Sequence, residues 1–484
     1  DQFIWKSRYH NPEDFVYSRT DGKAVEFDAD YDYRKYLPEG SPPLYVEGPD
    51  AKPHPGNLGL DSAKIAEFNA LYAGLSVLEK KQLYRYWNFQ SINERPKVIY
   101  NEKYGHYVLW THIEAGDFDN NYGTARAAVA VSQKPTGPFR LIWAYRVHYT
   151  PGTGHGDSGI GMSRDQTLLK DNVDSAKGDA WSLLGEEAWA SLNWADIEDL
   201  NGYGKGSDGV KDAYQLTSSV GNATMCINLL DDTFTRPLGI PYKAAADRGE
   251  QYPTAEGWLN RPGVDFNWTT VSQSRESPAV VIHYQDGVST YETENAPAAQ
   301  RRYYSVHSGT TGWFANTQRQ SRTNAGAPIL GYPRNITPGN TNWVGASGTG
   351  GTGNGWQNSG NWGSYVGPDP IRANPNGVAE DGSVAGQAFD GQTTYVLQLR
   401  YPAYDPDGNP EPKYGELVPG KYIWMADKWE PVIGLYDSRY IWLPMKILPE
   451  SGGGYARVAW MTEWRWEDFV YNQGPFAEPN ILFD

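Results

Sequence analysis

The chain has 484 residues, of which 58 are Asp or Glu and 42 are Lys or Arg, so its formal net charge is −16. This balance predicts a surface that repels nucleic acid and anionic lipid, and it favours neutral ligands or cations as partners. The single cysteine, Cys226, excludes an internal disulfide framework and a metal site built on cysteines. No run approaches the ~20 apolar residues of a membrane-spanning helix. Neither nucleic acid nor a membrane is therefore expected as a partner.

Other features of the sequence favour an extracellular protein. A chain that begins at Asp1 rather than at Met fits a processed, secreted protein. N-glycosylation sequons occur at Asn222, Asn267 and Asn335. Aromatic residues are abundant, and their rings serve either as core or as platforms on which sugars stack. We therefore predict a secreted glycoprotein with most of its aromatic residues in the core.

The predicted elements change in kind along the chain. Residues 1–93 form an irregular segment whose stretch 62–87 is predicted to be helical, because apolar residues recur at helical spacing and Ser76 with Glu79 forms a capping box. Short strands separated by Gly and Pro turns follow, with almost no helix. The expected strands are 97–101, 106–112, 125–132, 139–145, 167–169, 213–218, 225–230, 279–283, 303–307, 395–400, 422–426 and 439–445. This pattern predicts an all-β sandwich, barrel or propeller.

Residues 339–387 differ from the rest of this region. Glycines crowd together between 345 and 353, and Trp356, Trp362 and Tyr365 follow. The segment has too little aliphatic content to form a core of its own. We expect a long surface loop or, alternatively, a tryptophan-bearing flap over a binding cleft.

One acidic residue stands at the entrance of a predicted strand. Glu276 comes just before the apolar run Val280, Val281 and Ile282. A carboxyl group held against apolar neighbours has its charged form disfavoured, so it can stay protonated near neutral pH and act as a general acid. The alternative is a surface glutamate at the end of a strand.

Seven groups of short motifs occur in one order along the chain. They are Glu94-Arg-Pro-Lys-Val-Ile-Tyr-Asn101 with Tyr107-Val-Leu-Trp-Thr-His-Ile113, Ala128-Val-Ala-Val-Ser132 with Thr136-Gly-Pro-Phe139, Ser163-Arg-Asp-Gln-Thr-Leu-Leu169, Glu276-Ser-Pro-Ala279, Ser308-Gly-Thr-Thr-Gly-Trp313, Gln392-Thr-Thr-Tyr-Val396 and Asp437-Ser-Arg-Tyr-Ile-Trp-Leu-Pro444. In this order they resemble glycoside hydrolase family 43, in its exo-β-1,3-galactanase subfamily (subfamily 24).

The resemblance implies a fold as well as an activity. It runs from about Glu94 to Met445, with insertions near 171–211, 231–270 and 339–387, and it implies that residues 94–484 form the propeller region. The family fold is a five-bladed β-propeller with its active site on the axis. The irregular and partly helical residues 1–93 would then contribute to the first blade.

The resemblance also implies roles for individual residues. Glu276 corresponds to the general acid, and Asp165 to the aspartate that orients this acid and sets its pKa, since a nearby carboxylate raises the pKa of another. Inversion also needs a base ~6.5–9.5 Å from the acid. Gln392 matches the glutamine that replaces this base in the subfamily and is thought to act as its imidic tautomer. The positions that match those holding galactose hydroxyls are Glu94, Tyr122, Asn222 and Thr311.

Structural alternatives exist for these residues. Asp165 would otherwise cap a strand end, and Gln392 would be a polar residue of a turn. Glu94 would form an ion pair with Arg95 or Lys97.

Other positions bear on metals and on departures from the family. His155 and Asp157 lie in a glycine-rich loop, where such residues are routine, so we expect no catalytic metal and no other cofactor.

Residues 1–93 lack the first-blade motifs of the family. Its Ser-Ser-Glu sequence is here Ser218-Ser-Val220, and Asn222 lies in a sequon, where a glycan would obstruct a pocket.

Two functions follow from these observations. The first is a secreted, inverting glycoside hydrolase that releases galactose from β-1,3-galactan, a galactose-containing polysaccharide. The alternative is a catalytically inactive propeller that serves as an extracellular structural or glycan-binding protein. Because an incomplete first blade leaves strand edges open, we also expect an upstream fragment or a neighbouring copy of the chain to cover it.

Overall fold

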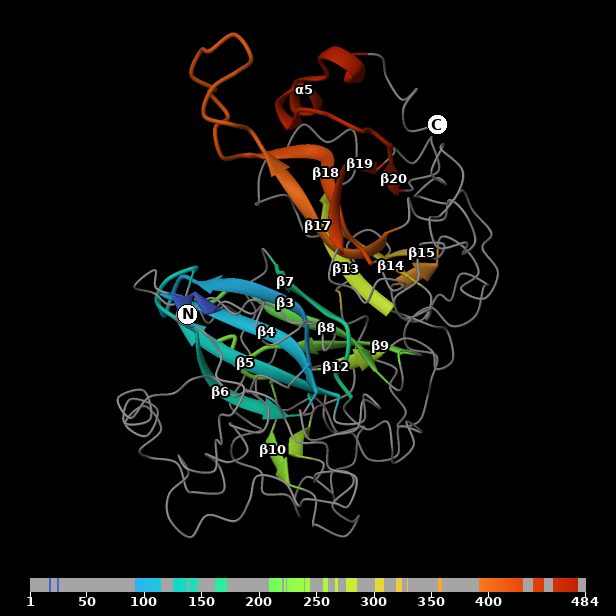
Figure 1. The fold of residues 1–484 in the computed structure, drawn as a ribbon. Helices are drawn as coiled ribbons and strands as arrows, with labels where there is room; N and C mark the ends of the chain where they lie inside the picture. The colour runs from blue at the N-terminus through green and yellow to red at the C-terminus, as the bar shows by residue number, and fades with distance from the viewer. Residues whose placement is uncertain are drawn as a thin grey trace.

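Strands form most of the part of the chain that the computed structural model describes (Figure 1). The described residues are 17–18, 24–25, 92–114, 125–136, 139–145, 147, 162–171, 209–219, 222, 224–238, 240–243, 256–259, 266–268, 276–284, 301–308, 319–323, 329, 356–358, 391–429, 438–447 and 456–477. Within them, the only helical elements are α5 (Trp466–Tyr471) and η10 (Gly474–Phe476). None of these described helices is long and apolar enough to cross a membrane. The all-β prediction is confirmed for this part of the chain.

Four antiparallel, four-stranded sheets follow one another in the described sequence. The first contains β3 (Ile92–Asn101), β4 (His106–Glu114), β5 (Arg126–Ser132) and β6 (Arg140–Tyr145). The second contains β7 (Gln166–Lys170), β8 (Ala213–Ser219), β9 (Thr224–Leu229) and β12 (Phe266–Trp268). The third contains β13 (Glu276–Tyr284), β14 (Arg301–Ser308), β15 (Arg319–Thr323) and β16 (Trp356–Asn358).

The fourth sheet completes this series. It contains β17 (Gln392–Arg400), β18 (Leu417–Lys428), β19 (Arg439–Ile447) and β20 (Ala456–Val458). Two smaller sheets pair β1 (Tyr17–Ser18) with β2 (Ala24–Val25) and β10 (Ile240–Lys243) with β11 (Glu256–Leu259).

The first strands of the four sheets meet at the centre of the molecule (Figure 1). β13 lies against both β7 and β17, and β3 lies against β7. Between β3 and β17, Arg95 Nη1 donates to the carbonyl oxygen of Thr393 at 3.3 Å, and Lys97 Nζ donates to Thr394 Oγ1 at 3.4 Å. The four first strands therefore surround one common centre, as the blades of a propeller do. The fifth blade stays a prediction, because it falls on residues 1–91, which lie almost entirely outside the described part.

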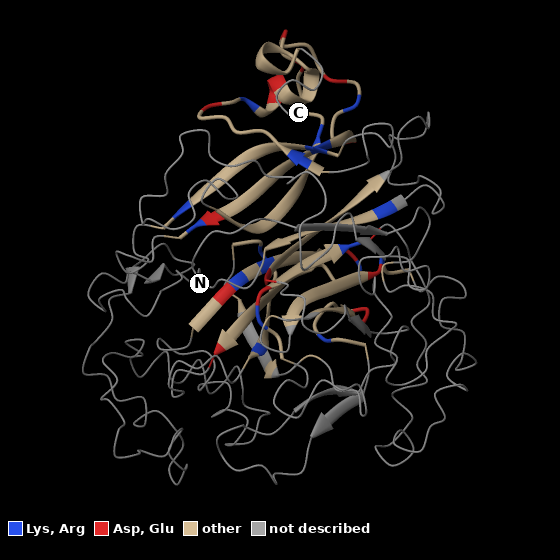
Figure 2. Cartoon of the chain, turned by 90° about the vertical axis from the view of Figure 1, so that its right-hand side faces the viewer, with Lys and Arg blue, Asp and Glu red and all other residues tan. Residues whose placement is uncertain are grey.

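The apolar run of β13 explains why this strand is buried on both faces. Val280 and Ile282 pack with Leu216 and Ile227 of the second sheet. Val281, which points the other way, packs with residues of the fourth sheet, including Trp424, Tyr422 and Met445. A strand covered on both sides needs consecutive apolar residues rather than alternating ones. Most residues of the described strands are uncharged, as the tan ribbon of Figure 2 shows.

Two of the intervals expected to be insertions contain strands of the four-stranded sheets. Within 231–270, β12 pairs with β9 and is an outer strand of the second sheet. Within 339–387, β16 pairs with β15 and is an outer strand of the third sheet, so this interval is not entirely a surface loop or flap. The predicted helix at 62–87 lies outside the described residues.

Candidate active site

The candidate site is formed where the first strands of the four sheets begin. Glu94 lies near the start of β3, Asp165 immediately precedes β7, and Glu276 and Gln392 are the first residues of β13 and β17. Glu276 and Gln392 are in direct contact, and Asp165 reaches the same group through Ser277. The structure therefore brings together three residues that lie far apart in the sequence.

Two β-bulges direct side chains toward this centre. The strand register shifts between Glu94 and Lys97 and between Glu276 and Ala279. Within these bulges Arg95 has φ of 55° and Ser277 has φ of 54°, a left-handed conformation that is unfavourable for residues other than glycine. Arg95 Nη2 donates to Ser277 Oγ at 2.6 Å. Backbone strain of this kind is concentrated at functional sites, where the surrounding contacts maintain it.

Asp165 is buried, and the contacts around it stabilise its ionised form. One carboxylate oxygen accepts hydrogen bonds from the backbone nitrogen of Ser277 at 3.0 Å and from its hydroxyl group at 2.9 Å. Arg95 Nε lies 3.6 Å from the other oxygen. Burial by itself raises the pKa of Asp165, but the charges of Arg95 and His112 and the hydrogen bonds from Ser277 outweigh burial and hold this pKa below its usual range. Asp165 is therefore a carboxylate at neutral pH.

Glu276 is held on both carboxyl oxygens by amide groups. Asn222 Nδ2 donates to Oε1 at 2.8 Å, and Gln392 Nε2 donates to Oε2 at 3.1 Å. The residue is buried. Each oxygen has a second lone pair, and a proton to be transferred would be carried there. Its position at the head of an apolar strand is the one that the sequence predicted.

Gln392 has four polar contacts that fix the orientation of its amide. Its oxygen accepts from Arg95 Nη2 and, at 3.0 Å, from Trp429 Nε1. Its nitrogen donates to Glu276 and, at 3.2 Å, to Ser308 Oγ. Because guanidinium and indole groups can only donate, the oxygen must face them.

This arrangement opposes the predicted role of Gln392 as a base. An imidic tautomer would carry a proton on the oxygen that already faces two donors. In addition, an inverting acid and base stand ~6.5–9.5 Å apart with a water between them. The nitrogen of Gln392 lies only 3.1 Å from Glu276. In this structure Gln392 holds Glu276 in place.

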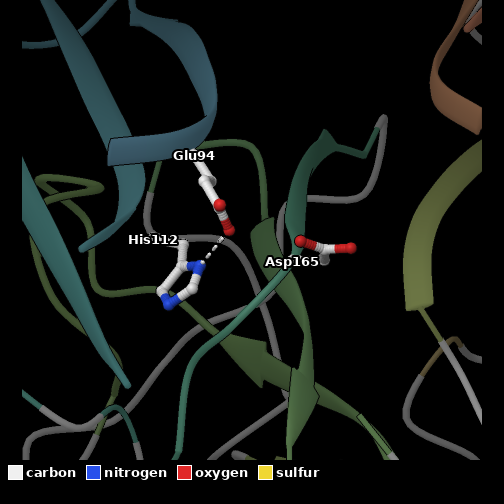
Figure 3. A group of neighbouring side chains, drawn as sticks. All are labelled: Glu94, His112 and Asp165. Carbon is white, nitrogen blue, oxygen red and sulfur yellow. Dashed lines mark hydrogen bonds and ion pairs between the residues drawn. The ribbon is translucent and has the colours of Figure 1, made fainter. Parts of the chain in front are cut away.

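A buried histidine, His112, lies between two glutamates, and Figure 3 shows it with one of them, Glu94, and with Asp165. His112 Nδ1 lies 3.1 Å from Glu94 Oε2, and Nε2 lies 2.8 Å from Glu114 Oε1. Burial lowers the pKa of His112, but the two glutamates outweigh burial and raise it to about 9. The ring is therefore an imidazolium that donates from both nitrogens.

The protonated ring does not fit a metal site, although the geometry resembles one. Ligand atoms of Glu94, His112 and Asp165 all lie within 4.8 Å of one another. An imidazolium, however, has no nitrogen lone pair to offer a metal ion. Asp165 is also engaged by Ser277 and Arg95. The three residues suit a network of charged hydrogen bonds better than a metal ion.

Several residues of the site were not predicted from the sequence. Asp427 of β18 accepts from Arg95 Nη1, and burial raises its pKa even though Arg95 and Lys97 lower it. Burial and the charge of Arg95 lower the pKa of Lys97 to about 8. Trp429 also faces the guanidinium of Arg95, whose carbon lies 5.6 Å from the ring centroid. Arg95 directly follows Glu94, a predicted site residue, in the same motif, and this adjacency is a sequence signal that could have pointed to it.

The remaining predicted residues divide into three groups. Asn222 is buried with its Nδ2 bonded to Glu276, so a glycan at this nitrogen would break the contact, and its position argues against glycosylation there. Asn267 lies on β12, whose side chains are not described. The residues outside the described part are Tyr122, Thr311, Asn335, His155 and Asp157.

Comparisons with known proteins give matches only among solved structures. No protein-family model matches the chain, and no curated protein matches it. A family 43 β-1,3-galactosidase is 24% identical with a TM-score of 0.41, over 78% of this chain and 77% of that one. Another family 43 β-1,3-galactosidase is 21% identical with a TM-score of 0.40, over 79% of this chain and 48% of that one.

An exo-β-1,3-galactanase from Clostridium thermocellum is 18% identical with a TM-score of 0.41, over 77% of this chain and 49% of that one. The chain thus spans about half the length of two of these matched chains. It is similar to family 43 enzymes of the galactanase type, the group that its motifs resemble.

Proposed function

We propose that this chain is an extracellular glycoside hydrolase that releases galactose from the ends of β-1,3-galactan by inversion. The observation that carries the proposal is the buried carboxyl group of Glu276, held on both oxygens by Asn222 and Gln392 beside the ionised Asp165. Glycoside hydrolysis needs a carboxyl group that can donate a proton in a fixed orientation, close to groups that remain charged.

The roles of the two carboxyl groups follow from their contacts. Glu276 donates its proton to the glycosidic oxygen as the bond from this oxygen to the anomeric carbon breaks. Water adds to the opposite face of the sugar and releases one proton to the surrounding water, and Glu276 takes up a proton again before the next turnover. Asp165 binds the backbone nitrogen and the hydroxyl group of Ser277, the next residue after Glu276. It therefore fixes the backbone that carries the acid. Inversion enters the proposal through the resemblance to the family.

The charges around the site support a neutral sugar as the substrate. Carboxyl groups outnumber basic groups there, so an anionic sugar such as a uronate would be repelled. The carboxyl groups are Glu94, Glu114, Asp165, Glu276 and Asp427, and the basic groups are Arg95, Lys97 and His112. Glu94 keeps 14% of its side chain exposed, compared with 1% for His112, so it can accept hydrogen bonds from sugar hydroxyls.

A second function is favoured by one contact. Gln392 holds Glu276 directly, and its amide orientation opposes action as a base. A site with an acid but no base would bind galactan without cleaving it. The alternative proposal is therefore an extracellular protein that binds galactan or has a structural role.

Incubation with β-1,3-galactan distinguishes the two proposals. Galactose release that is lost in Glu276→Gln supports the enzyme, and proton NMR of the first product would show the α-anomer if the reaction inverts. Saturable binding of β-1,3-galactan by calorimetry without galactose release supports the binding protein. If the protein neither binds β-1,3-galactan nor releases galactose from it, both the enzyme and the galactan-binding protein are contradicted, and only the structural role is left.

A further inference from the structure

His112 occupies an unusual position for a histidine in a protein core. It lies on β4, the second strand of the first sheet, and only 1% of its side chain is exposed. Both ring nitrogens lie within hydrogen-bond distance of a carboxylate, Glu94 on one side and Glu114 on the other. A neutral imidazole ring carries one N–H group and an imidazolium carries two, so only the charged form can donate to two ionised glutamates at once.

Glu114 connects this histidine to the backbone. Its two carboxylate oxygens accept from the backbone nitrogen of Ala125 at 3.0 and 2.9 Å. Ala125 has φ of 41° and precedes β5. Glu114 is thereby fixed in place. Since Glu114 binds Nε2 of His112, the ring cannot rotate without breaking this contact.

The titratable groups that face His112 come from three elements. Glu94 lies on β3, Glu114 lies on β4 with His112, and Asp165 precedes β7. All three are acids. The cation nearest in sequence to Glu94 is Arg95, and it directs its guanidinium nitrogens to Asp165, Ser277, Gln392 and Asp427.

We propose that His112, as an imidazolium, is a positioning residue that holds the carboxylate of Glu94 ready to accept hydrogen bonds from substrate hydroxyls. This inference rests on the proposed function of the site. A neutral His112 would donate to one glutamate and turn a lone pair toward the other. Glu94, which is more exposed than Glu114, would then lose its fixed orientation.

The test compares His112→Gln with the parent and with His283→Gln as a matched control. His283 is also buried, but its Nδ1 lies 3.1 Å from the hydroxyl of Tyr422. For His112→Gln we expect KM for β-1,3-galactan to rise about tenfold with a smaller change in kcat, since a charge-assisted hydrogen bond is lost. In the parent, KM should rise as the pH passes about 9, where His112 loses its proton, and this rise should be absent from His112→Gln.

An independent measurement separates this inference from the proposed function. Nitrogen-15 NMR of the histidine side chains should show His112 doubly protonated at pH 8, and Glu94→Gln should lower the pH at which it titrates. A neutral ring at pH 8, or an unchanged KM in folded His112→Gln, would overturn the proposal. If the parent released no galactose, the proposed function would fail. The affinity of His112→Gln for β-1,3-galactobiose and the NMR titration would then decide the role of His112.

Discussion

Replacing Arg95 with Met tests whether one side chain holds the four sheets together. Arg95 extends from β3 and contacts Asp165 next to β7, Ser277 on β13, Gln392 on β17 and Asp427 on β18. It is 6% exposed. Methionine has a similar length but cannot donate a hydrogen bond. The variant therefore removes these contacts with little change in volume.

The expected loss of stability is large. Removing one partner of a buried ion pair typically costs about 3–5 kcal/mol, because the remaining charge is left uncompensated in the interior. Arg95→Met leaves two buried carboxyl groups, Asp165 and Asp427, without this partner. Natural proteins are stable by only about 5–15 kcal/mol. The variant should therefore lose at least about a fifth of the total stability.

Unfolding in urea, followed by tryptophan fluorescence, measures this loss. Arg400→Met is the matched control, because Arg400 is an exposed arginine of β17 that donates to the carbonyl oxygen of Gly415 at 2.6 Å. The control should change the free energy of unfolding by about 0.5 kcal/mol or less. If Arg95→Met lay within about 1 kcal/mol of the parent protein, the central role of Arg95 would be refuted.

Three further variants test individual contacts. Glu276→Gln should lower turnover by roughly 10²–10⁴-fold while calorimetric affinity for galactan stays nearly unchanged, because only the transferable proton is lost. Ser277→Ala removes a hydrogen-bond donor to Asp165. The lowered pKa of Asp165 contributes stability that is lost as the pH falls through the pKa of this group in the folded protein. Because the substitution raises that pKa, the acid unfolding transition, followed by circular dichroism, should shift to higher pH. Burial and nearby Lys446 lower the pKa of Lys421 to about 7, so the stability of the parent should rise from pH 7 towards 10, and Lys421→Met should reduce this rise in urea titrations.

The strands of the central region could be predicted because their signals are local. The predicted hairpin at 97–112 is β3 and β4, joined by a turn in which Gly105 has φ of 65°. β12 and β16 could not be predicted in the same way, since each has three residues. Such a short strand has no visible period, and it is defined by pairing with a distant strand.

The site shows a similar division. Asp165, Glu276 and Gln392 stand out because each begins or precedes an apolar strand within a motif. Asp427 and His112 lie on second strands, and only the arrangement of sheets in space shows that they face the same centre. Sequence spacing carries no information about such contacts between sheets.

The contact between Gln392 and Glu276 is compatible with both proposed functions. For catalysis, a sugar must approach Glu276 closely enough to receive its proton, so one of the two amide donors has to yield. Gln392 is held on its oxygen by Arg95 and Trp429, independently of Glu276. A sugar hydroxyl that accepts from Gln392 Nε2 could replace Glu276 as the acceptor and leave the amide where it is. The acid would then be released by the substrate itself, and Gln392 would contribute to binding in either function.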